Sequence, residues 1–108
     1  MSNVFEELTK LDRLIHEPAR LAVLTALSAC QETDFLFLRR LTGLSAGNFS
    51  VHLSKLEDAG LVKTEKKIVA KRTHTHISIT KKGNEAIGDY WRKIESLRKD
   101  ADNWEMDE

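Results

Sequence analysis

The sequence is poor in cysteine and has no long apolar run. Cys30 is the single cysteine, so the chain can form neither an internal disulfide nor a metal site built from several cysteines. No apolar run approaches the roughly 18 residues that a membrane-spanning helix needs. The opening residues, MSNVFEELTK, lack the basic start and apolar core of a secretion signal, so we expect a cytoplasmic protein.

The sequence also lacks the residue patterns of catalysis. It contains no Ser/His/Asp, Cys/His or paired-carboxylate arrangement and no glycine-rich phosphate loop, so we expect no enzyme and no cofactor. His74 and His76 have a spacing that can bind a metal, but no third ligand is in view. We therefore predict no metal site and expect both to be neutral polar residues or phosphate contacts.

The charge of the chain is segregated. Its 17 basic and 17 acidic residues cancel. The segment from Arg39 to Lys82, however, holds ten Lys or Arg and three acidic residues, a balance of +7, which leaves −7 for the remainder. Segregated charge bears on partners rather than on fold. A basic middle indicates a nucleic-acid partner; the alternative is chance clustering on solvated faces.

The 108 residues suffice for one domain, which we expect to span 1–108. Hydrophobic periodicity predicts a first helix over about Asn3–Ile15 and a last helix over about Lys81–Lys99, capped by Thr80. Pro18 suits the first turn of a second helix, PARLAVLTALSAC. This helix is apolar nearly all round and is therefore expected to be buried on several sides.

The terminal helices, within residues 1–15 and 81–101, are expected to mediate dimerisation and to leave 102–108 as an acidic, frayed tail. A two-fold dimer would cover apolar stripes that a lone chain would struggle to cover. The predicted interface residues are Phe5, Leu8, Leu11, Ile15, Tyr90, Trp91, Ile94 and Leu97. Tyr90 and Trp91 could instead line a ligand pocket, but their helical spacing favours core or interface.

Two helices joined by a tight turn are predicted in the basic middle. Asp34 can cap a short helix over Phe35–Leu41, which Gly43 ends. After the turn LTGLS, Ser45 can cap a longer helix that ends near Gly60. This order is the helix-turn-helix pattern, whose second helix enters the major groove of DNA.

The front of the longer helix is small and polar, although glycine and asparagine weaken a helix. Phe49, Leu53 and Leu56 form its buried stripe. On the opposite side, small residues would let the backbone approach a groove. There Asn48 could read adenine and Val51 could touch a thymine methyl. This front predicts sequence-specific contact with DNA.

The pattern then changes to a period of two, which predicts a hairpin with strands over 61–70 and 71–80. The second strand alternates between two faces, with Thr75, Ile77 and Ile79 on one and His74, His76 and Ser78 on the other. The hairpin carries five cations that could reach phosphates or the minor groove: Lys63, Lys66, Lys67, Lys71 and Arg72.

Three stretches, HEPARLAVLTAL, DFLFLRRLTGLSAGNFSVHLSKLEDAGLVK and THISITKKGNEAI, carry a family resemblance over about Leu14–Tyr90. They resemble the winged helix-turn-helix transcriptional regulators, most of all the compact group close to the ArsR and MarR repressor families. The resemblance implies a mainly α fold with a small β-hairpin wing, here Lys66–His74 with Arg72 at its tip. It also implies a recognition helix over Ser45–Ala59 and a dimer bound to a pseudo-palindromic operator.

Two features depart from that family. The short helix, DFLFLRRL, lacks the paired cysteines of ArsR-type metal sensors, and the last helix lacks their alternative His-rich zinc ligands. The resemblance therefore does not extend to metal sensing. Leu36 and Phe37 stand where polar residues are expected, and we predict that they pack against the terminal helices or a partner.

We therefore predict a sequence-specific transcriptional regulator, a repressor that binds double-stranded DNA as a homodimer. The alternative is a winged-helix protein-interaction module without DNA binding, which the basic middle disfavours. No effector can be assigned. The predicted DNA-contacting residues are Arg39, Arg40, Ser45, Ala46, Gly47, Asn48, Ser50, Val51, Ser54, Lys55, Lys66, Lys67, Lys71 and Arg72.

Four side chains keep two interpretations each. Cys30, at the end of an apolar helix, is interpreted as a buried small hydrophobe rather than a redox switch. His52, at the edge of the buried stripe, is interpreted as a partly buried packing residue rather than one that orients the helix or contacts phosphate. Arg39 and Arg40 either contact phosphate or are simply solvated.

Overall fold

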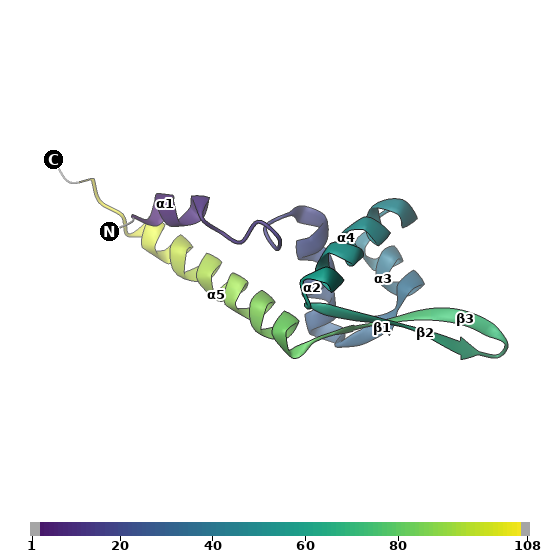
Figure 1. Ribbon diagram of the computed structural model, residues 1–108. Coiled ribbons are helices and arrows are strands. Elements are labelled where there is room, and N and C mark those ends of the chain that lie inside the picture. The colour runs from purple at the N-terminus through teal and green to yellow at the C-terminus, as the bar shows by residue number, and fades with distance from the viewer. Residues whose placement is uncertain (1–2, 107–108) are drawn as a thin grey trace.

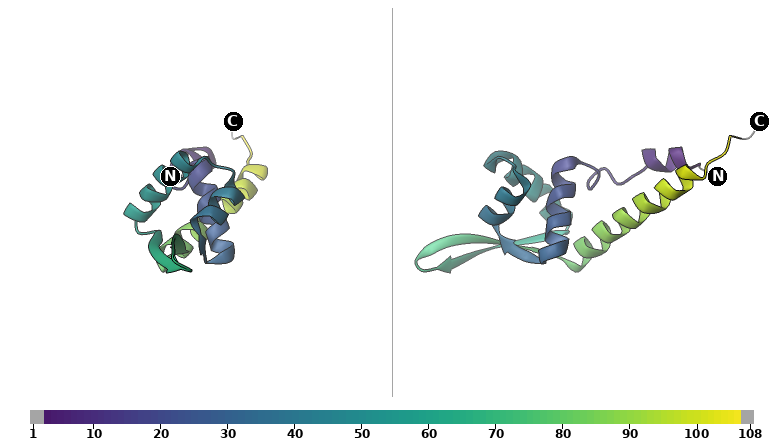
Figure 2. Two further views of the ribbon diagram at one scale, coloured as in Figure 1. Left: turned by 90° about the vertical axis from the view of Figure 1, so that its right-hand side faces the viewer. Right: turned by 180° about the vertical axis from the view of Figure 1, so that it is seen from behind.

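The computed structural model describes residues 3–106, which form an elongated molecule of 70 × 26 × 21 Å. A head contains α2 (Pro18–Cys30), two further helices and a sheet (Figure 1). An arm extends from it, in which α1 (Val4–Thr9) lies along the C-terminal part of α5 (Lys81–Asp102). Figure 2 shows from behind that the arm and the hairpin point to opposite ends of the molecule.

The first helix is shorter than the predicted Asn3–Ile15, because α1 ends at Thr9. Residues 10–17 form turns instead. Within them, Oδ1 of Asp12 accepts the backbone N–H of Leu14 at 2.9 Å. Such a local side-chain bond competes with helical hydrogen bonding, and it gives the chain a non-helical connection between arm and head.

The helix-turn-helix is confirmed. The short helix α3 (Phe35–Thr42) is capped by the side chain of Asp34, and Gly43 ends it in the left-handed conformation with φ 72°. The longer helix α4 (Ala46–Asp58) is capped by Ser45, whose hydroxyl accepts a backbone N–H of the first turn. These caps are local side-chain bonds, which is why the sequence predicts them.

The sheet has three antiparallel strands in the order β1-β3-β2, one strand more than predicted. The strands β2 (Val62–Val69) and β3 (Arg72–Ile79) form the expected hairpin, in which Val62 lies opposite Ile79. The unpredicted strand β1 (Glu32–Asp34) pairs with the inner end of β3. Three residues are too few for an alternating pattern to appear in a sequence.

One hydrophobic core joins the helices of the head to the inner end of the sheet. Its most deeply buried large side chains are Ile15, Val23, Leu24, Leu27, Leu38, Phe49, Leu56, Ile77 and Ile87. A second, small cluster of Val4, Leu11 and Leu97 holds α1 against α5 in the arm. The mainly α fold with a small sheet is therefore confirmed.

The end of α5 lies slightly beyond its predicted end, at Asp102. Trp104 then packs edge to face on Phe5, with ring centroids 5.2 Å apart. The predicted tail 102–108 and the predicted domain 1–108 both include terminal residues outside the described part of the chain. Among the described residues, no helix is both long and apolar enough to cross a membrane.

Candidate nucleic-acid interface

The front of α4 is open to solvent. Phe49, Leu53 and Leu56 are buried in the core, as predicted, which turns the opposite side of the helix outward. The predicted contact residues on this helix and its cap are all exposed: Ser45, Ala46, Gly47, Asn48, Ser50, Val51, Ser54 and Lys55. Gly47 has no heavy atom within 4 Å of the position a Cβ would take. The helix thus presents a solvent-exposed surface of mostly small and polar side chains.

The far end of α4 is fixed to the hairpin. Oε2 of Glu57 accepts the backbone N–H of Thr64 at 3.0 Å and also the Thr64 hydroxyl. Nζ of Lys82 donates to the carbonyl of Ala59 at 2.9 Å. Because Glu57 and Thr64 belong to different elements, α4 and β2 are held in a defined relation. Glu57, one of three acidic residues in the basic middle, already has partners in this arrangement.

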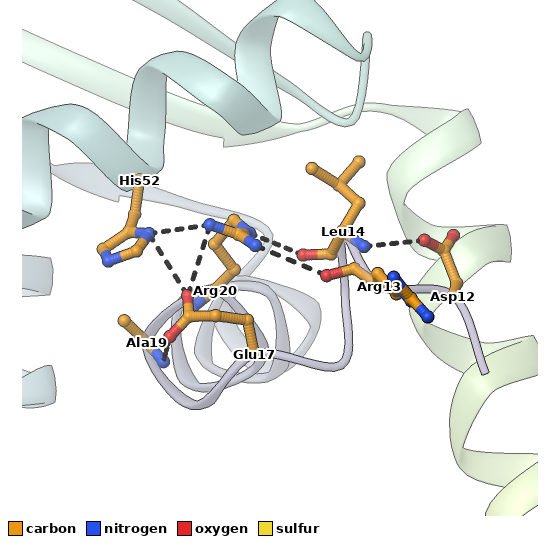
Figure 3. A network of polar contacts seen from close by, with 7 residues as sticks. All are labelled: Asp12, Arg13, Leu14, Glu17, Ala19, Arg20 and His52. Atoms are coloured by element: carbon orange, nitrogen blue, oxygen red, sulfur yellow. Dashed lines mark hydrogen bonds and ion pairs between the residues drawn. The ribbon is translucent and has the colours of Figure 1, made fainter. Parts of the chain in front are cut away.

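A polar network at the middle of α4 joins it to α2 (Figure 3). Nδ1 of His52 lies 3.0 Å from Nη1 of Arg20 and 3.2 Å from Oε2 of Glu17. The guanidinium of Arg20 also donates through Nε to the carbonyl of Leu14 at 2.6 Å and through Nη2 to that of Arg13 at 3.3 Å. His52 is therefore half-buried, with polar partners in α2 and at the residue that caps it.

The Glu17 carboxylate is stabilised in its charged form. Partial burial alone would raise its pKa, but hydrogen bonds from the backbone N–H groups of Ala19 and Arg20 outweigh that effect, together with the charges of His52 and Arg20. The pKa of Glu17 is consequently below its ordinary value. The carboxylate caps α2 and supplies the negative charge of the network.

The hairpin projects from the head as a free ribbon. Every residue from Glu65 to His74 is exposed. Its two-residue turn consists of Ala70 and Lys71. Arg72, which the family resemblance placed at the tip, is the first residue of β3 and follows this turn directly. Within the described chain, no ion pair engages the hairpin cations Lys66, Lys67, Lys71 and Arg72.

The acidic residue of the hairpin is neutralised. Oε1 of Glu65 lies 2.8 Å from Nζ of Lys63. The side-chain hydrogen bond and charge of Lys63 lower the pKa of Glu65, and Glu65 in turn raises the pKa of Lys63. The outer hairpin therefore presents positive charge only.

The two arginines of α3 differ. Arg39 is half-buried and donates through Nη1 to the carbonyl of Leu44 at 3.4 Å, across the turn between α3 and α4. Arg40 is exposed. Arg39 therefore stabilises the turn, while the side chain of Arg40 is open to solvent.

The predicted dimer residues fall into two sets. Four are already buried within the single chain: Leu11, Ile15, Tyr90 and Leu97. These four are needed inside the chain because they hold the arm together and seat it on the head. The other four keep accessible apolar surface: Phe5, Leu8, Trp91 and, half-buried, Ile94.

Tyr90 lies between the arm and the head. Its hydroxyl is 2.7 Å from Nδ1 of His16, and burial raises the pKa of Tyr90. Tyr90 also lines an open hollow of about 330 Å³ between α5 and residues 10–15. Trp91 donates through Nε1 to the hydroxyl of Thr25 at 3.1 Å, which ties α5 to α2.

The expectation for Cys30 was wrong, and so was one of the two alternatives for Leu36 and Phe37. Cys30 is exposed, because it lies in the last turn of α2 on the side away from the core. Leu36 and Phe37 do not pack against the terminal helices of the same chain, since they are 51% and 48% exposed and form an open apolar face on α3 with Leu41. Their packing against a partner stays a prediction. The arm points away from this face, which is why it stays uncovered.

The histidines of the sheet do not gather further ligands. His74 and His76 lie on one face of β3, as alternation predicted, and Nε2 of His76 is 3.5 Å from a carboxylate oxygen of Glu32. In the described part of the chain, no group of three or more His, Cys, Asp or Glu side chains could hold a metal ion.

Sequence reasoning missed Glu17 and Arg20, the partners of His52. Arg20 is separated from His52 by 32 positions, and no local pattern reports such a contact. One signal was present: Arg20 is the single charged residue of a helix that is otherwise apolar nearly all round. A charge in that position needs partners, because burying it alone would be costly.

A family model described as a winged helix DNA-binding domain matches residues 19–97. The chain belongs to this winged-helix family. The match includes the helix-turn-helix, the whole sheet and most of α5. The resemblance to winged helix-turn-helix regulators that the sequence motifs indicated is thereby confirmed.

Individual proteins are also similar to this chain. An uncharacterised protein of Methanocaldococcus jannaschii is 32% identical over 90 residues, which cover 83% of this chain and 98% of that protein. The HTH-type transcriptional regulator YgaV of Escherichia coli is 36% identical over 61 residues, 56% of this chain and 62% of that protein. A solved transcriptional regulator homologue from Pyrococcus horikoshii is 27% identical with a TM-score of 0.83, covering 92% of this chain and 97% of that one.

Proposed function

We propose that this winged-helix protein is a sequence-specific transcriptional repressor that binds a pseudo-palindromic DNA operator as a homodimer. The front of α4 enters the major groove, and the hairpin contacts phosphates or the adjacent minor groove. The observation that carries this proposal is the pairing of an open, small and polar helix front with a hairpin of unpaired cations.

The residues of this surface divide the work of binding. Asn48 and Ser50 offer hydrogen-bonding side chains to base edges, and Val51, which is exposed, offers an apolar contact for a thymine methyl. Lys66, Lys67, Lys71 and Arg72 attract phosphates without reading sequence. The names of the relatives that are transcriptional regulators support the same function for this chain.

The homodimer is supported by the arm. Phe5 and Leu8 keep exposed fractions of 45% and 40% in α1, and Trp91 keeps 37% in α5. A second copy related by a two-fold axis would cover these side chains with its own. It would also place two α4 helices about 34 Å apart, one turn of DNA, so that each reads a half-site.

A salt series tests DNA binding. Fluorescence anisotropy of a labelled random duplex should give an affinity that falls steeply as salt rises, because each neutralised phosphate releases counterions. Each removed hairpin cation should lower the slope of log affinity against log salt by about one. No response to salt, or no binding, would contradict the proposal and favour a protein-interaction module.

Two variants distinguish phosphate contact from base recognition. Both are measured on a DNA duplex selected from a random pool. Arg72→Ala should weaken binding to all sequences about equally and reduce the salt slope. Asn48→Ala should cost about 1–3 kcal/mol at particular base pairs and relax the preference there. If both variants bind like the unchanged protein, the assignment of α4 to the groove is wrong.

A further inference from the structure

One guanidinium holds three separate segments of the chain together. Arg20 belongs to α2, yet it donates to the carbonyls of Leu14 and Arg13 in the connection and lies within hydrogen-bonding distance of His52 in α4. Its side chain is only 11% exposed. The planar fork of arginine, with donors fixed in direction, suits such a three-way contact, whereas a lysine ammonium could not reproduce it.

The connection forms the joint between arm and head together with α5, which runs from the sheet into the arm. Residues 10–17 are not helical; the buried Leu11 and Ile15 anchor them by packing, and side-chain hydrogen bonds fix them further. Arg20 binds this connection from the side of α2, and His16 binds Tyr90 of α5 at 2.7 Å. The joint is thus fixed on both sides.

The contact with His52 extends this joint to the recognition helix. Nδ1 of His52 can accept a hydrogen bond from Arg20 or, when it carries a proton, donate one to Glu17, but it cannot do both. In either state the imidazole ties the middle of α4 to the first turn of α2. The rotation of α4 that turns Val51 outward is set by the buried Phe49, Leu53 and Leu56, and the contacts of His52 add a polar link from the middle of this helix to α2.

We propose that Arg20 and His52 are positioning residues that fix the angle between the recognition helix and the arm, and thereby the spacing of the half-sites that a dimer reads. This inference rests on the proposed function. Neighbouring base pairs are about 3.4 Å apart along DNA, so a small rotation at the joint would move α4 out of register with its half-site. The contacts of Arg20 with His52 and with the connection, called the clamp below, would thus fix the distance between the two recognition helices of a dimer.

A measurement without DNA tests the clamp itself. Spin labels are placed at Ser54→Cys in α4 and Ser96→Cys in α5, in a Cys30→Ser background, and labelled chains are diluted with unlabelled ones so that distances within one chain are measured. The unchanged network should give a narrow distance distribution, and Arg20→Gln should broaden or shift it. An unchanged distribution in Arg20→Gln would overturn the inference, whether or not the protein binds DNA.

Variants at His52 keep the test decisive if Arg20→Gln fails to fold. His52→Phe keeps a ring but removes the acceptor for Arg20, so it should broaden the distribution. His52→Asn keeps an acceptor near the position of Nδ1 and should restore it. Arg92→Gln is the matched control, because Arg92 is a 71% exposed arginine that pairs with Asp89 within α5. Equal distributions for His52→Phe and His52→Asn would contradict the clamp.

The consequence for DNA is tested with a selected operator whose half-site spacing is changed by one base pair in each direction. The unchanged protein should prefer one spacing. Arg20→Gln and His52→Phe should bind a single half-site within about twofold of the unchanged protein but lose about fivefold or more of the spacing preference, in the range of typical coupling between sites. An unchanged spacing preference would overturn the inference while leaving the proposed DNA binding intact.

Discussion

At Gly83, in the first turn of α5, the backbone of the helix passes so close to the strand connection that no side chain fits. A Cβ at this position would lie 2.1 Å from the carbonyl oxygen of Leu61 and 2.8 Å from Cγ1 of Ile79. The same Leu61 carbonyl accepts the backbone N–H of Thr80 at 3.0 Å, so it cannot easily move. The junction between sheet and arm therefore depends on a glycine.

Gly83→Ala should destabilise the protein by about 2 kcal/mol or more, since overpacking of a fixed backbone costs about 1–3 kcal/mol. Urea denaturation followed by circular dichroism measures the change. Gly47→Ala, in α4, is the matched control, because a Cβ at this position would lie in open space. It should stabilise the helix by roughly 0.5 kcal/mol. Equal free energies of unfolding for the two variants would show that the close approach at Gly83 does not restrict the side chain at this position.

How far single residues could be predicted depends on the distance their contacts span. The caps Asp34, Ser45 and Thr80 bond backbone N–H groups within three residues, and all three were predicted. The partners of His52 lie in another helix and were not predicted. The exposure of Cys30 was missed because apolar character nearly all round α2 does not show which side the core occupies.

Among the elements, the hairpin has an unusual turn. Ala70 and Lys71 both have positive φ, 51° and 65°, the pair of left-handed residues that a type I′ turn requires. Neither residue is the glycine or asparagine that such turns favour. The conformation costs about 1–2 kcal/mol for each residue with a Cβ.

Ala70→Asn should stabilise the hairpin by about 0.5–1 kcal/mol, because asparagine tolerates the left-handed conformation better. Amide hydrogen exchange of the outer parts of β2 and β3 should slow, and the charge of the hairpin is unchanged. Ala70→Val, a β-branched residue at the same position, should instead speed exchange. Faster exchange in Ala70→Asn would contradict this description of the turn.

The elements that the sequence predicts are those with their own periodic signal. The hairpin and the helices α3, α4 and α5 all have one, and each was found within a few residues of its predicted bounds. The first helix was predicted too long, because Leu11 and Ile15 continue its apolar spacing although they are buried from a turn rather than a helix. Hydrophobic periodicity shows which side chains are buried. It does not show where the helix ends, which here follows from the hydrogen bond of the Asp12 side chain to the backbone of Leu14.

At the scale of the whole molecule, the chain is more extended than its length requires. Its radius of gyration is 17.0 Å, whereas a compact chain of this length would have about 13 Å. The arm and the projecting hairpin, at opposite ends of the molecule, account for the difference. The helix α1 of the arm has six residues, far fewer than the ~12 that an isolated helix needs for marginal stability, so it depends on packing.

Sedimentation equilibrium at micromolar concentration should therefore give twice the mass of the chain. Leu8→Lys, at an exposed apolar position of α1, should weaken the proposed dimer about tenfold or more, the effect of losing one central interface contact. Thr9→Lys adds the same charge one residue along and should have a smaller effect. A monomer for the unchanged protein would contradict the dimer and with it the two-half-site operator.

The order of the sheet gives the hairpin lysines a second consequence. Because β3 lies between β1 and β2, the outer side of β2 is an open sheet edge. Such an edge can pair with the strand of another molecule, and here it carries two exposed β-branched residues, Ile68 and Val69. Lys66 and Lys67 precede them on the same strand, and charged lysines oppose edge-to-edge pairing. We therefore expect the cations proposed to contact phosphate also to oppose aggregation of the unbound protein, so that neutralising them would reduce solubility together with affinity.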